Sequence, residues 1–219
     1  MSSQLFLVVE DHPEVAHNNC KFLQMLDSSA VCIPIEDTQK VLERLQLETP
    51  DLVVVDLQFG SRDGTETAQP GLNLLRQIFK QYPTLNILIY TSEYSWLQGL
   101  GEQIQCHDGG FVVVSKLERR KAFLEGAEEA LNGDFRIPNE LQRHFRLALT
   151  ERDLEILEMV CQESLTDRAI AQRLHVSLKT AQNYIQRLKI KLGVNLTNSD
   201  TSSRVGLCME AIRRKLLVL

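Results

Sequence analysis

Residues 149–193 have the sequence LTERDLEILEMVCQESLTDRAIAQRLHVSLKTAQNYIQRLKIKLG, and this stretch decides the fold of the last third of the chain. It contains three helical segments. Each follows a hydroxyl or carboxylate side chain that can accept hydrogen bonds from the free N–H groups at the start of a helix. The expected caps are Thr150, in an approximate capping box with Asp153, then Thr166 or Asp167, and then Ser177.

The second and third segments, residues 168–174 and 178–192, are separated only by the short turn 175–177. Two helices joined by such a turn form a helix-turn-helix unit, whose second helix enters the major groove of DNA. The apolar face of the third segment consists of Ala181, Ile185, Leu188 and Leu192. The predicted DNA-binding residues on its remaining surface are Lys179, Thr180, Gln182, Asn183, Tyr184, Gln186, Arg187 and Lys191.

The polar side chains of the third segment have the chemistry needed for DNA. Gln and Asn can pair with adenine, and Arg or Lys with guanine. Thr180, Tyr184, Lys189 and Lys191 can contact phosphates, and Arg187 can contact either a base or a phosphate. Any one of these side chains alone would also fit an ordinary solvated helix face, so the prediction rests on the segment as a whole.

Three groups of residues carry a family resemblance. They are 149–152 (LTER), 170–171 (IA) and Ser177 with Thr180-Ala181. Together with Leu188, Leu192 and Gly193 they make residues 149–219 resemble the helix-turn-helix domain of NarL/FixJ (LuxR-type) regulators. The resemblance implies a DNA-binding transcriptional regulator. The family usually has Val and then Lys or Arg after the threonine, whereas this chain has Ala181 and Gln182, so one contact loses its charge.

A fourth helix is expected over residues 203–217, which makes the predicted domain an all-α unit of four helices. The resemblance implies that this helix pairs two subunits on DNA. Its apolar stripe fits either a dimer contact or the core of the domain itself. We assign Val205 and Cys208 to a homodimer contact.

The net charge of −5 is divided unequally along the chain. Residues 150–219 carry 11 Lys and Arg against 8 Asp and Glu, whereas residues 1–149 carry 13 against 21. The opposite signs indicate that the two parts have different partners, with double-stranded promoter DNA expected for the second.

Residues 1–132 alternate short apolar runs with amphipathic segments. The runs show no clean apolar–polar alternation, which is typical of parallel strands covered on both faces. We therefore expect a doubly wound α/β domain with a five-stranded parallel sheet, of flavodoxin-like type, then a linker over 133–148. The expected strands are Leu5–Val9, Val31–Ile35, Leu52–Val55, Ile87–Tyr90 and Phe111–Val114. The expected helices are Pro13–Leu26, Thr38–Leu47, Leu72–Phe79 and Leu117–Leu131, with a weaker one in Ser95–Gln105.

Polar side chains follow four of these strands. Glu10 and Asp11 follow the first strand, Asp56 the third, Thr91 the fourth and Lys116 the fifth. Ligands of open parallel sheets bind at this edge. Each residue alone would more often be a helix cap or a solvated side chain, but their joint order predicts a site. Clustered carboxylates favour Mg²⁺, and Asp56 can form an acyl phosphate.

This pattern resembles the receiver domain of two-component response regulators over residues 3–132. The resemblance implies that a sensor histidine kinase phosphorylates Asp56. It also implies that Thr91 and Lys116 contact the phosphoryl group, and that Mg²⁺ is held by Glu10, Asp11, Asp56 and the backbone carbonyl of Gln58.

The chain departs from the receiver pattern at several positions. Glu10 replaces the usual Asp, Leu117 replaces the usual Pro, and the loop over residues 57–71 is longer than usual. Val113 occupies the position of the family's switch aromatic, and Ser92 that of a small Ala or Gly. These changes weaken the expected threonine–aromatic coupling more than the phosphorylation chemistry.

Two alternatives follow. The first is a pseudo-receiver transcription factor, controlled by a protein or redox partner without phosphorylation. The second is an aspartyl-phosphate phosphatase of the dehalogenase type, which needs a second Asp two residues after the nucleophile. Because this chain has Gln58 there, we expect no enzyme.

The five cysteines, an odd and scattered set, favour reduced structural thiols in a cytoplasmic protein and disfavour zinc. No run is long and apolar enough for a membrane helix, and the first residues lack the features of a signal peptide.

Overall fold

The structure is a computed structural model that describes residues 3–60, 66–144, 149–194, 203–214 and 216–217. The chain divides into two compact units, Met1–Leu141 and Gln142–Leu219. The first unit extends beyond the expected boundary at residue 132. Residues 133–141, part of the expected linker, instead pack on the first unit through buried Phe135, Ile137 and Leu141.

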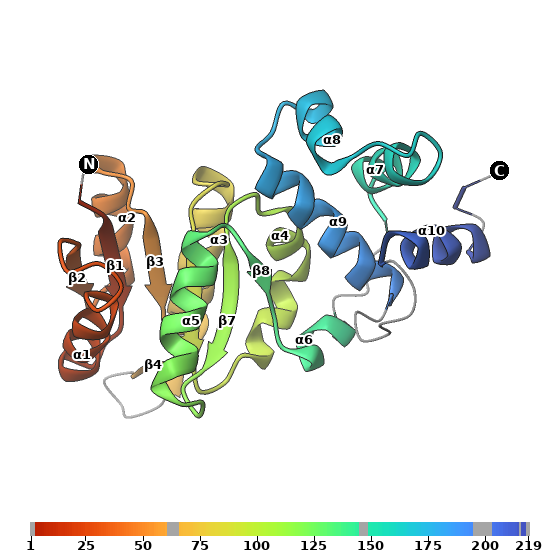
Figure 1. The fold of residues 1–219 in the computed structure, drawn as a ribbon. Coiled ribbons are helices and arrows are strands. Elements are labelled where there is room, and N and C mark those ends of the chain that lie inside the picture. Colours follow the sequence, from red (N-terminus) through yellow and green to blue (C-terminus); the bar gives the residue numbers. More distant parts are fainter. Residues whose placement is uncertain (1–2, 61–65, 145–148, 195–202, 215, 218–219) are drawn as a thin grey trace. The chain divides into compact units, whose positions relative to one another are not determined.

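The first unit is built on a parallel sheet with strand order β2-β1-β3-β6-β7-β8 (Figure 1). The five predicted strands are present, and a short sixth strand, β8, pairs with β7 at the edge. The strands are β1 (Leu5–Val9), β2 (Val31–Ile35), β3 (Leu52–Val55), β6 (Ile87–Thr91), β7 (Phe111–Ser115) and β8 (Phe135–Arg136). All residues of β1 and β3 are buried, as expected for strands covered on both faces.

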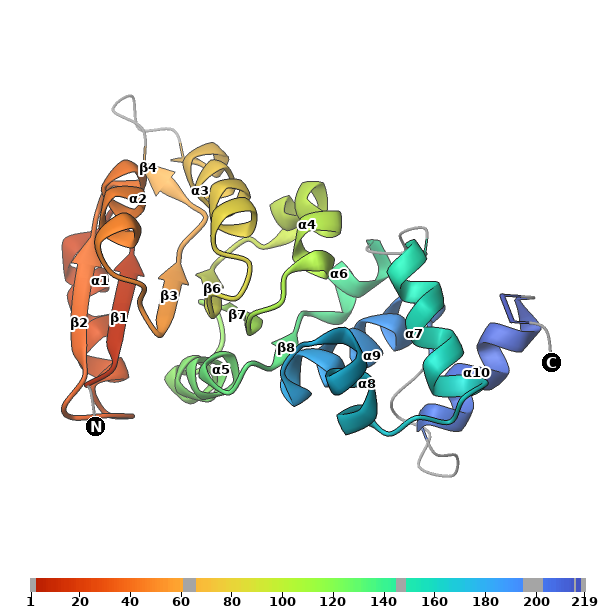
Figure 2. The same ribbon diagram turned by 90° about the horizontal axis from the view of Figure 1, so that it is seen from above.

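Helices cover both faces of this sheet (Figure 2). α1 (Pro13–Leu23) and α5 (Arg120–Leu131) share one face, where Ala16, Cys20 and Phe123 pack on Phe6 and Val8. α2 (Thr38–Leu47) and α3 (Gln69–Gln81) contact each other on the opposite face, and α3 contacts α4 (Gly101–Cys106). A 3₁₀ helix, η1 (Ser95–Leu100), precedes α4, and α6 (Asn139–His144) follows β8.

The long loop after Asp56 contains two short strands, β4 (Phe59–Gly60) and β5 (Glu66–Thr67), which pair antiparallel. No helix or strand was expected in this loop. Two paired residues on each side are too few to produce a periodic pattern, so this hairpin was not predictable from the sequence.

The second unit is helical, with α7 (Glu151–Cys161), α8 (Asp167–Leu174), α9 (Leu178–Leu192) and α10 (Ser203–Arg213). The predicted caps are confirmed. Thr166 and Ser177 accept backbone hydrogen bonds, and Thr150 forms a capping box with Asp153. The last helix ends at Arg213, shorter than the expected 203–217.

The prediction that all cysteines are unpaired is wrong for the structure. Cys20 of α1 bonds to Cys32 of β2, and Cys161 of α7 bonds to Cys208 of α10, whereas Cys106 is free and exposed. Sequence spacing did not indicate these pairs, because each joins two elements that meet only in the folded units. Among the described residues, no helix is long and apolar enough to cross a membrane.

Candidate functional site

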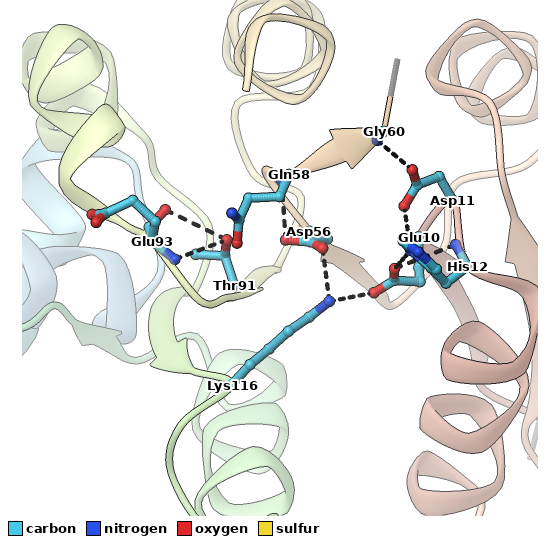
Figure 3. Close-up of polar contacts among 9 residues, drawn as sticks. All are labelled: Glu10, Asp11, His12, Asp56, Gln58, Gly60, Thr91, Glu93 and Lys116. Carbon is cyan, nitrogen blue, oxygen red and sulfur yellow. Dashed lines mark hydrogen bonds and ion pairs between the residues drawn. The ribbon is translucent and has the colours of Figure 1, made fainter. Parts of the chain in front are cut away.

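Four of the predicted site residues lie at the carboxyl ends of the central strands (Figure 3). Glu10 directly follows β1, Asp56 follows β3 and Lys116 follows β7, while Thr91 ends β6. Lys116 Nζ donates to Glu10 Oε2 at 2.6 Å and to Asp56 Oδ2 at 2.7 Å. The lysine therefore joins the two carboxylates, 106 and 60 residues away in the chain.

Burial controls the electrostatics of this cluster. Glu10 is 1% and Asp56 5% exposed. Burial raises the pKa of Glu10, although its contact with Lys116 opposes the rise. Burial alone would lower the pKa of Lys116, but the ion pairs with Asp56 and Glu10 outweigh that effect and raise it. The site therefore stabilises a positive charge between its carboxylates.

Asp11 lies on the solvent side of Glu10. Its Oδ2 accepts a hydrogen bond from the backbone N–H of Gly60 in β4 at 2.6 Å. Its Oδ1 lies 2.9 Å from His12 Nδ1, and this contact raises the pKa of His12. Ligand atoms of Glu10, Asp11 and His12 lie within 4.8 Å of one another. His12 was not among the predicted site residues, although it directly follows the two acidic residues.

The β4–β5 hairpin also forms part of a cavity of about 620 Å³ beside Asp11. Residues of α2 and α3 complete the walls, and Phe59, Gly60 and Thr67 come from the hairpin. The long loop after Asp56 therefore defines one approach to the acidic edge.

Gln58 and Thr91 lie near Asp56 (Figure 3). The backbone N–H of Gln58 donates to Asp56 Oδ1 at 3.1 Å. Thr91 is fully buried, and its hydroxyl donates to the carbonyl of Glu93 at 3.4 Å. The structure thus joins Lys116 directly to Asp56, whereas the hydroxyl of Thr91 is bonded within its own loop.

The donor set fits a hard divalent cation. Glu10, Asp11 and Asp56 supply carboxylate oxygens, and Mg²⁺ prefers oxygen ligands. Glu10 and Asp56 share a single ammonium, that of Lys116, so a bound cation would supply further positive charge to this group of carboxylates.

The predicted DNA-binding residues of helix α9 differ in their exposure to solvent. Gln182 is exposed, and Lys179, Thr180 and Gln186 are half-buried. Asn183, Tyr184, Arg187 and Lys191 are buried.

The structure corrects the prediction for two of these residues, Tyr184 and Lys191. Tyr184 belongs to the apolar core of the second unit, and its hydroxyl accepts a hydrogen bond from Arg152 Nη1 at 3.3 Å. Lys191 points inward, where its Nζ pairs with Asp153 Oδ2 at 2.5 Å. The prediction that both side chains lie on the outward face of α9 is therefore wrong.

The two residues predicted to form the dimer contact differ in whether they are free to reach a second subunit. Val205 is 50% exposed on α10, as an intermolecular contact requires. The sulfur of Cys208 is instead bonded to Cys161 within the same unit. The predicted contact therefore rests on Val205.

Two family models match the chain. The response regulator receiver domain matches residues 6–125, which is more than half of the chain and includes Glu10, Asp56 and Lys116. The chain belongs to the response regulators. The luxR family of bacterial regulatory proteins matches residues 147–199, which include α7, α8 and α9. This response regulator is of the NarL/FixJ type, a two-component regulator of transcription with a helix-turn-helix domain for DNA.

Relatives of this response regulator align with it over most of both chains. It is 28% identical to the transcriptional activator protein ExaE of Pseudomonas putida, over 94% of this chain and 95% of the relative. It is 27% identical to the DNA-binding transcriptional activator DevR/DosR of Mycobacterium tuberculosis, over 85% and 87% of the two chains.

Solved structures agree with the fold. A structure of two RcsB dimers bound to two parallel DNAs covers 96% of this chain and 98% of that chain, with a TM-score of 0.50 and 20% identity. The isolated receiver domain of RcsB from Salmonella enterica serovar Typhimurium covers 65% and 99%, with a TM-score of 0.50 and 17% identity.

Proposed function

We propose that this response regulator is phosphorylated on Asp56 by a sensor histidine kinase and then binds promoter DNA as a homodimer. The observation that carries the proposal is the ammonium of Lys116 between Glu10 and Asp56, at the carboxyl ends of the strands. An acidic side chain with a lysine beside it can accept a phosphoryl group and neutralise its added charge.

Asp56 acts as the nucleophile in this proposal. One of its carboxylate oxygens forms a bond to phosphorus while the bond from phosphorus to the donor's imidazole nitrogen breaks. Lys116 keeps its ammonium at the site and pairs with a phosphoryl oxygen. Thr91 donates its hydroxyl to another oxygen once it leaves the carbonyl of Glu93.

Glu10, Asp11, Asp56 and the backbone carbonyl of Gln58 would hold Mg²⁺. When bound, the cation neutralises the negative charge of the carboxylates and of the incoming phosphoryl group. We propose that the protein works in the cytoplasm, where its DNA and a kinase domain are accessible, and that it has no enzymatic turnover of its own.

Phosphorylation adds negative charge to a buried edge of the sheet and shifts an equilibrium between two arrangements of the protein. Since Val113 occupies the position of the family's switch aromatic, we propose that this shift uses a route other than a threonine–aromatic pair.

DNA recognition is assigned to α9, with the exposed Gln182 and the half-buried Lys179, Thr180 and Gln186 as the candidate contacts. Asn183 and Arg187 are buried, so they could contact bases only if their side chains turned outward on binding. Val205 on α10 contributes the proposed dimer contact.

The second candidate function is a transcription factor controlled by a redox or protein partner without phosphorylation. The two disulfides favour it, as does the buried aliphatic Val113 in place of an aromatic. Retention of Asp56 and Lys116 in direct contact favours phosphorylation.

The experiment that separates them uses acetyl phosphate and Mg²⁺ on the full chain. Intact-mass measurement is expected to show one added phosphoryl group on the wild type and none on Asp56→Asn. Equal reaction of both proteins would show that Asp56 is not the acceptor, and no reaction of either would favour the second candidate.

A separate experiment tests DNA binding. The full chain, with and without acetyl phosphate, is used to enrich duplexes from a random library. Affinity for an enriched duplex is expected to fall steeply with salt, because phosphate contacts release counterions. Failure to enrich any duplex would contradict the DNA-binding role assigned to α9.

A further inference from the structure

A disulfide between Cys161 and Cys208 joins two helices of the second unit. Cys161 is the last residue of α7, and Cys208 lies in the middle of α10, 47 residues later. Their Cα atoms are 5.4 Å apart, within the usual span of a disulfide. Because both side chains are only half-buried, small thiols and disulfides can approach the sulfur atoms.

Besides the disulfide, α10 is attached by one apolar side and by polar contacts at its two ends. At its start, Arg204 Nη2 pairs with Asp167 Oδ1 at 2.6 Å, and Ser203 Oγ accepts a hydrogen bond from Lys189 Nζ at 2.9 Å. Leu207 and Ala211 are buried in the core of the unit. Arg204 Nη1 donates to the carbonyl of Leu165 at 2.7 Å, and Arg214 Nη2 donates to that of Leu192 at 2.7 Å. An isolated helix of 11 residues is marginal in water, so the order of α10 depends on these attachments.

The same helix carries the exposed apolar residues of the unit's proposed dimer face. Val205 is 50% and Met209 62% exposed. They lie four residues apart and so share one face of α10. Cys208 directly precedes Met209, so the disulfide restrains the part of α10 that presents this face.

We propose that Cys161 and Cys208 form a reversible redox site, and that their disulfide holds α10 in the arrangement used for dimerisation on DNA. The second half of this proposal rests on the proposed function. The oxidant is a low-molecular-weight disulfide of the glutathione type, and the reductant is the corresponding thiol or a dithiol.

The exchange proceeds in two balanced steps. A thiolate of the pair attacks one sulfur of the small disulfide, forming a mixed disulfide and releasing one small thiolate. The second cysteine, as thiolate, attacks the protein sulfur of the mixed disulfide and releases the other small thiolate. The two protein thiols are oxidised, the small disulfide is reduced to two thiols, and the two protons pass to the released thiolates.

A reversible role agrees with the proposed compartment. Disulfides are rare in the cytosol, and those that occur there are usually transient or redox-sensing. Cys161–Cys208 differs from Cys20–Cys32 in what it joins. The first pair joins two helices, one of which presents Val205, whereas the second joins α1 to the edge strand β2.

The first test measures the bond and its effect on α10. The full chain is equilibrated in glutathione buffers of increasing oxidised fraction, alkylated and analysed by peptide mass spectrometry and amide hydrogen exchange. We expect a Cys161–Cys208 crosslinked peptide in the wild type and in Cys106→Ser, but none in Cys208→Ser. Amides of α10 should exchange about tenfold faster or more in the reduced wild type, since the crosslink restrains the unfolded helix.

The paired Cys20→Ser/Cys32→Ser variant is the matched control and should keep the redox dependence of α10. Cys161→Ala and Cys208→Ala replace the serine variants if serine prevents folding. A wild type with no Cys161–Cys208 peptide at any ratio, or with equal α10 exchange in oxidised and reduced buffer, overturns the redox site.

The second test measures affinity for a duplex enriched by the wild type. The oxidised wild type should bind about tenfold more tightly than the reduced protein, or about 1.4 kcal/mol. The Cys161→Ser/Cys208→Ser variant should be insensitive to the buffer. Equal wild-type affinity in both buffers overturns control by the disulfide while the proposed DNA-binding function stands. Binding in neither buffer overturns the proposed function and the second half of this proposal, and the first test still decides the redox site.

Discussion

Lys191 and Asp153 form a buried ion pair inside the helical unit, with 2.5 Å between Nζ and Oδ2. The same Oδ2 accepts hydrogen bonds from the backbone N–H and the hydroxyl of Thr150, at 2.7 and 2.8 Å. The end of α9 is thereby joined to the capping box that begins α7. Lys191, on the helix that we propose to contact DNA, therefore has a structural partner within its own unit, and this changes the expected effect of substituting it.

Lys191→Met should lower the free energy of unfolding of the second unit by about 3 kcal/mol, because it leaves the carboxylate of Asp153 buried without its cation. Urea denaturation of the full chain measures this change. Gln182→Ala on the same helix is the control and should stay within about 0.5 kcal/mol of the wild type, since Gln182 is exposed. Unchanged stability with a smaller salt dependence of DNA binding would instead assign Lys191 to a phosphate.

Gln182→Lys should strengthen DNA binding. The change restores a positive charge at an exposed position of α9 where related domains usually have one. The slope of log K against log salt should steepen by about 0.9, the value for one additional neutralised phosphate. Gln182→Glu, measured on the same enriched duplex, should weaken binding. If the lysine variant keeps the wild-type slope, position 182 faces away from the phosphate backbone.

Lys116→Met should make the first unit depend on Mg²⁺. Without the ammonium, Glu10 and Asp56 repel each other, and the pKa of Glu10, already raised by burial, should rise further. In EDTA we expect the Tm to fall by roughly 3 °C or more, and Mg²⁺ should raise the Tm of the variant more than that of the wild type.

Lys121→Met is the matched control for that measurement. Lys121 is 84% exposed and pairs with Glu125 on the surface of α5, where an ion pair contributes little. Its Tm and its response to Mg²⁺ should equal those of the wild type. Equal Mg²⁺ shifts in Lys116→Met and the wild type would show that Lys116 does not occupy the cation site.

Glu210 should give the second unit a specific sensitivity to acid. Hydrogen bonds from Arg213 and Arg214 lower its pKa from 4.5 to about 2. A lowered carboxyl pKa stabilises the folded state above the ordinary pKa, and this contribution is lost as the pH falls from about 4.5 to about 2. The Tm advantage of the wild type over Glu210→Gln should therefore shrink across this window. An advantage that stays constant through it would contradict the ion pairs, and added salt should reduce the advantage at neutral pH.

Local patterns in the sequence were sufficient to predict those parts of the fold whose signals lie within a single helix or strand. Short apolar runs predicted β1, β2, β3, β6 and β7, and the caps Thr150, Thr166 or Asp167, and Ser177 predicted the starts of their helices. The site was predicted from the order of the strands and of the polar residues that follow them, because the carboxyl ends of parallel strands meet at one edge of the sheet. That rule placed Lys116 near Asp56 without any knowledge of their contact.

The sequence by itself thus determined the two-domain family, the order of the elements and the acidic edge with Asp56. Only the tertiary structure decided which cysteines pair, that Lys191 points inward, and that β8 extends the sheet. Lys191 lies beside the apolar stripe of α9, where helical periodicity permits either orientation. Its partner, Asp153, is 38 residues away. A long-range contact of that kind exists only when packing brings two elements together, and no local pattern in the chain encodes it.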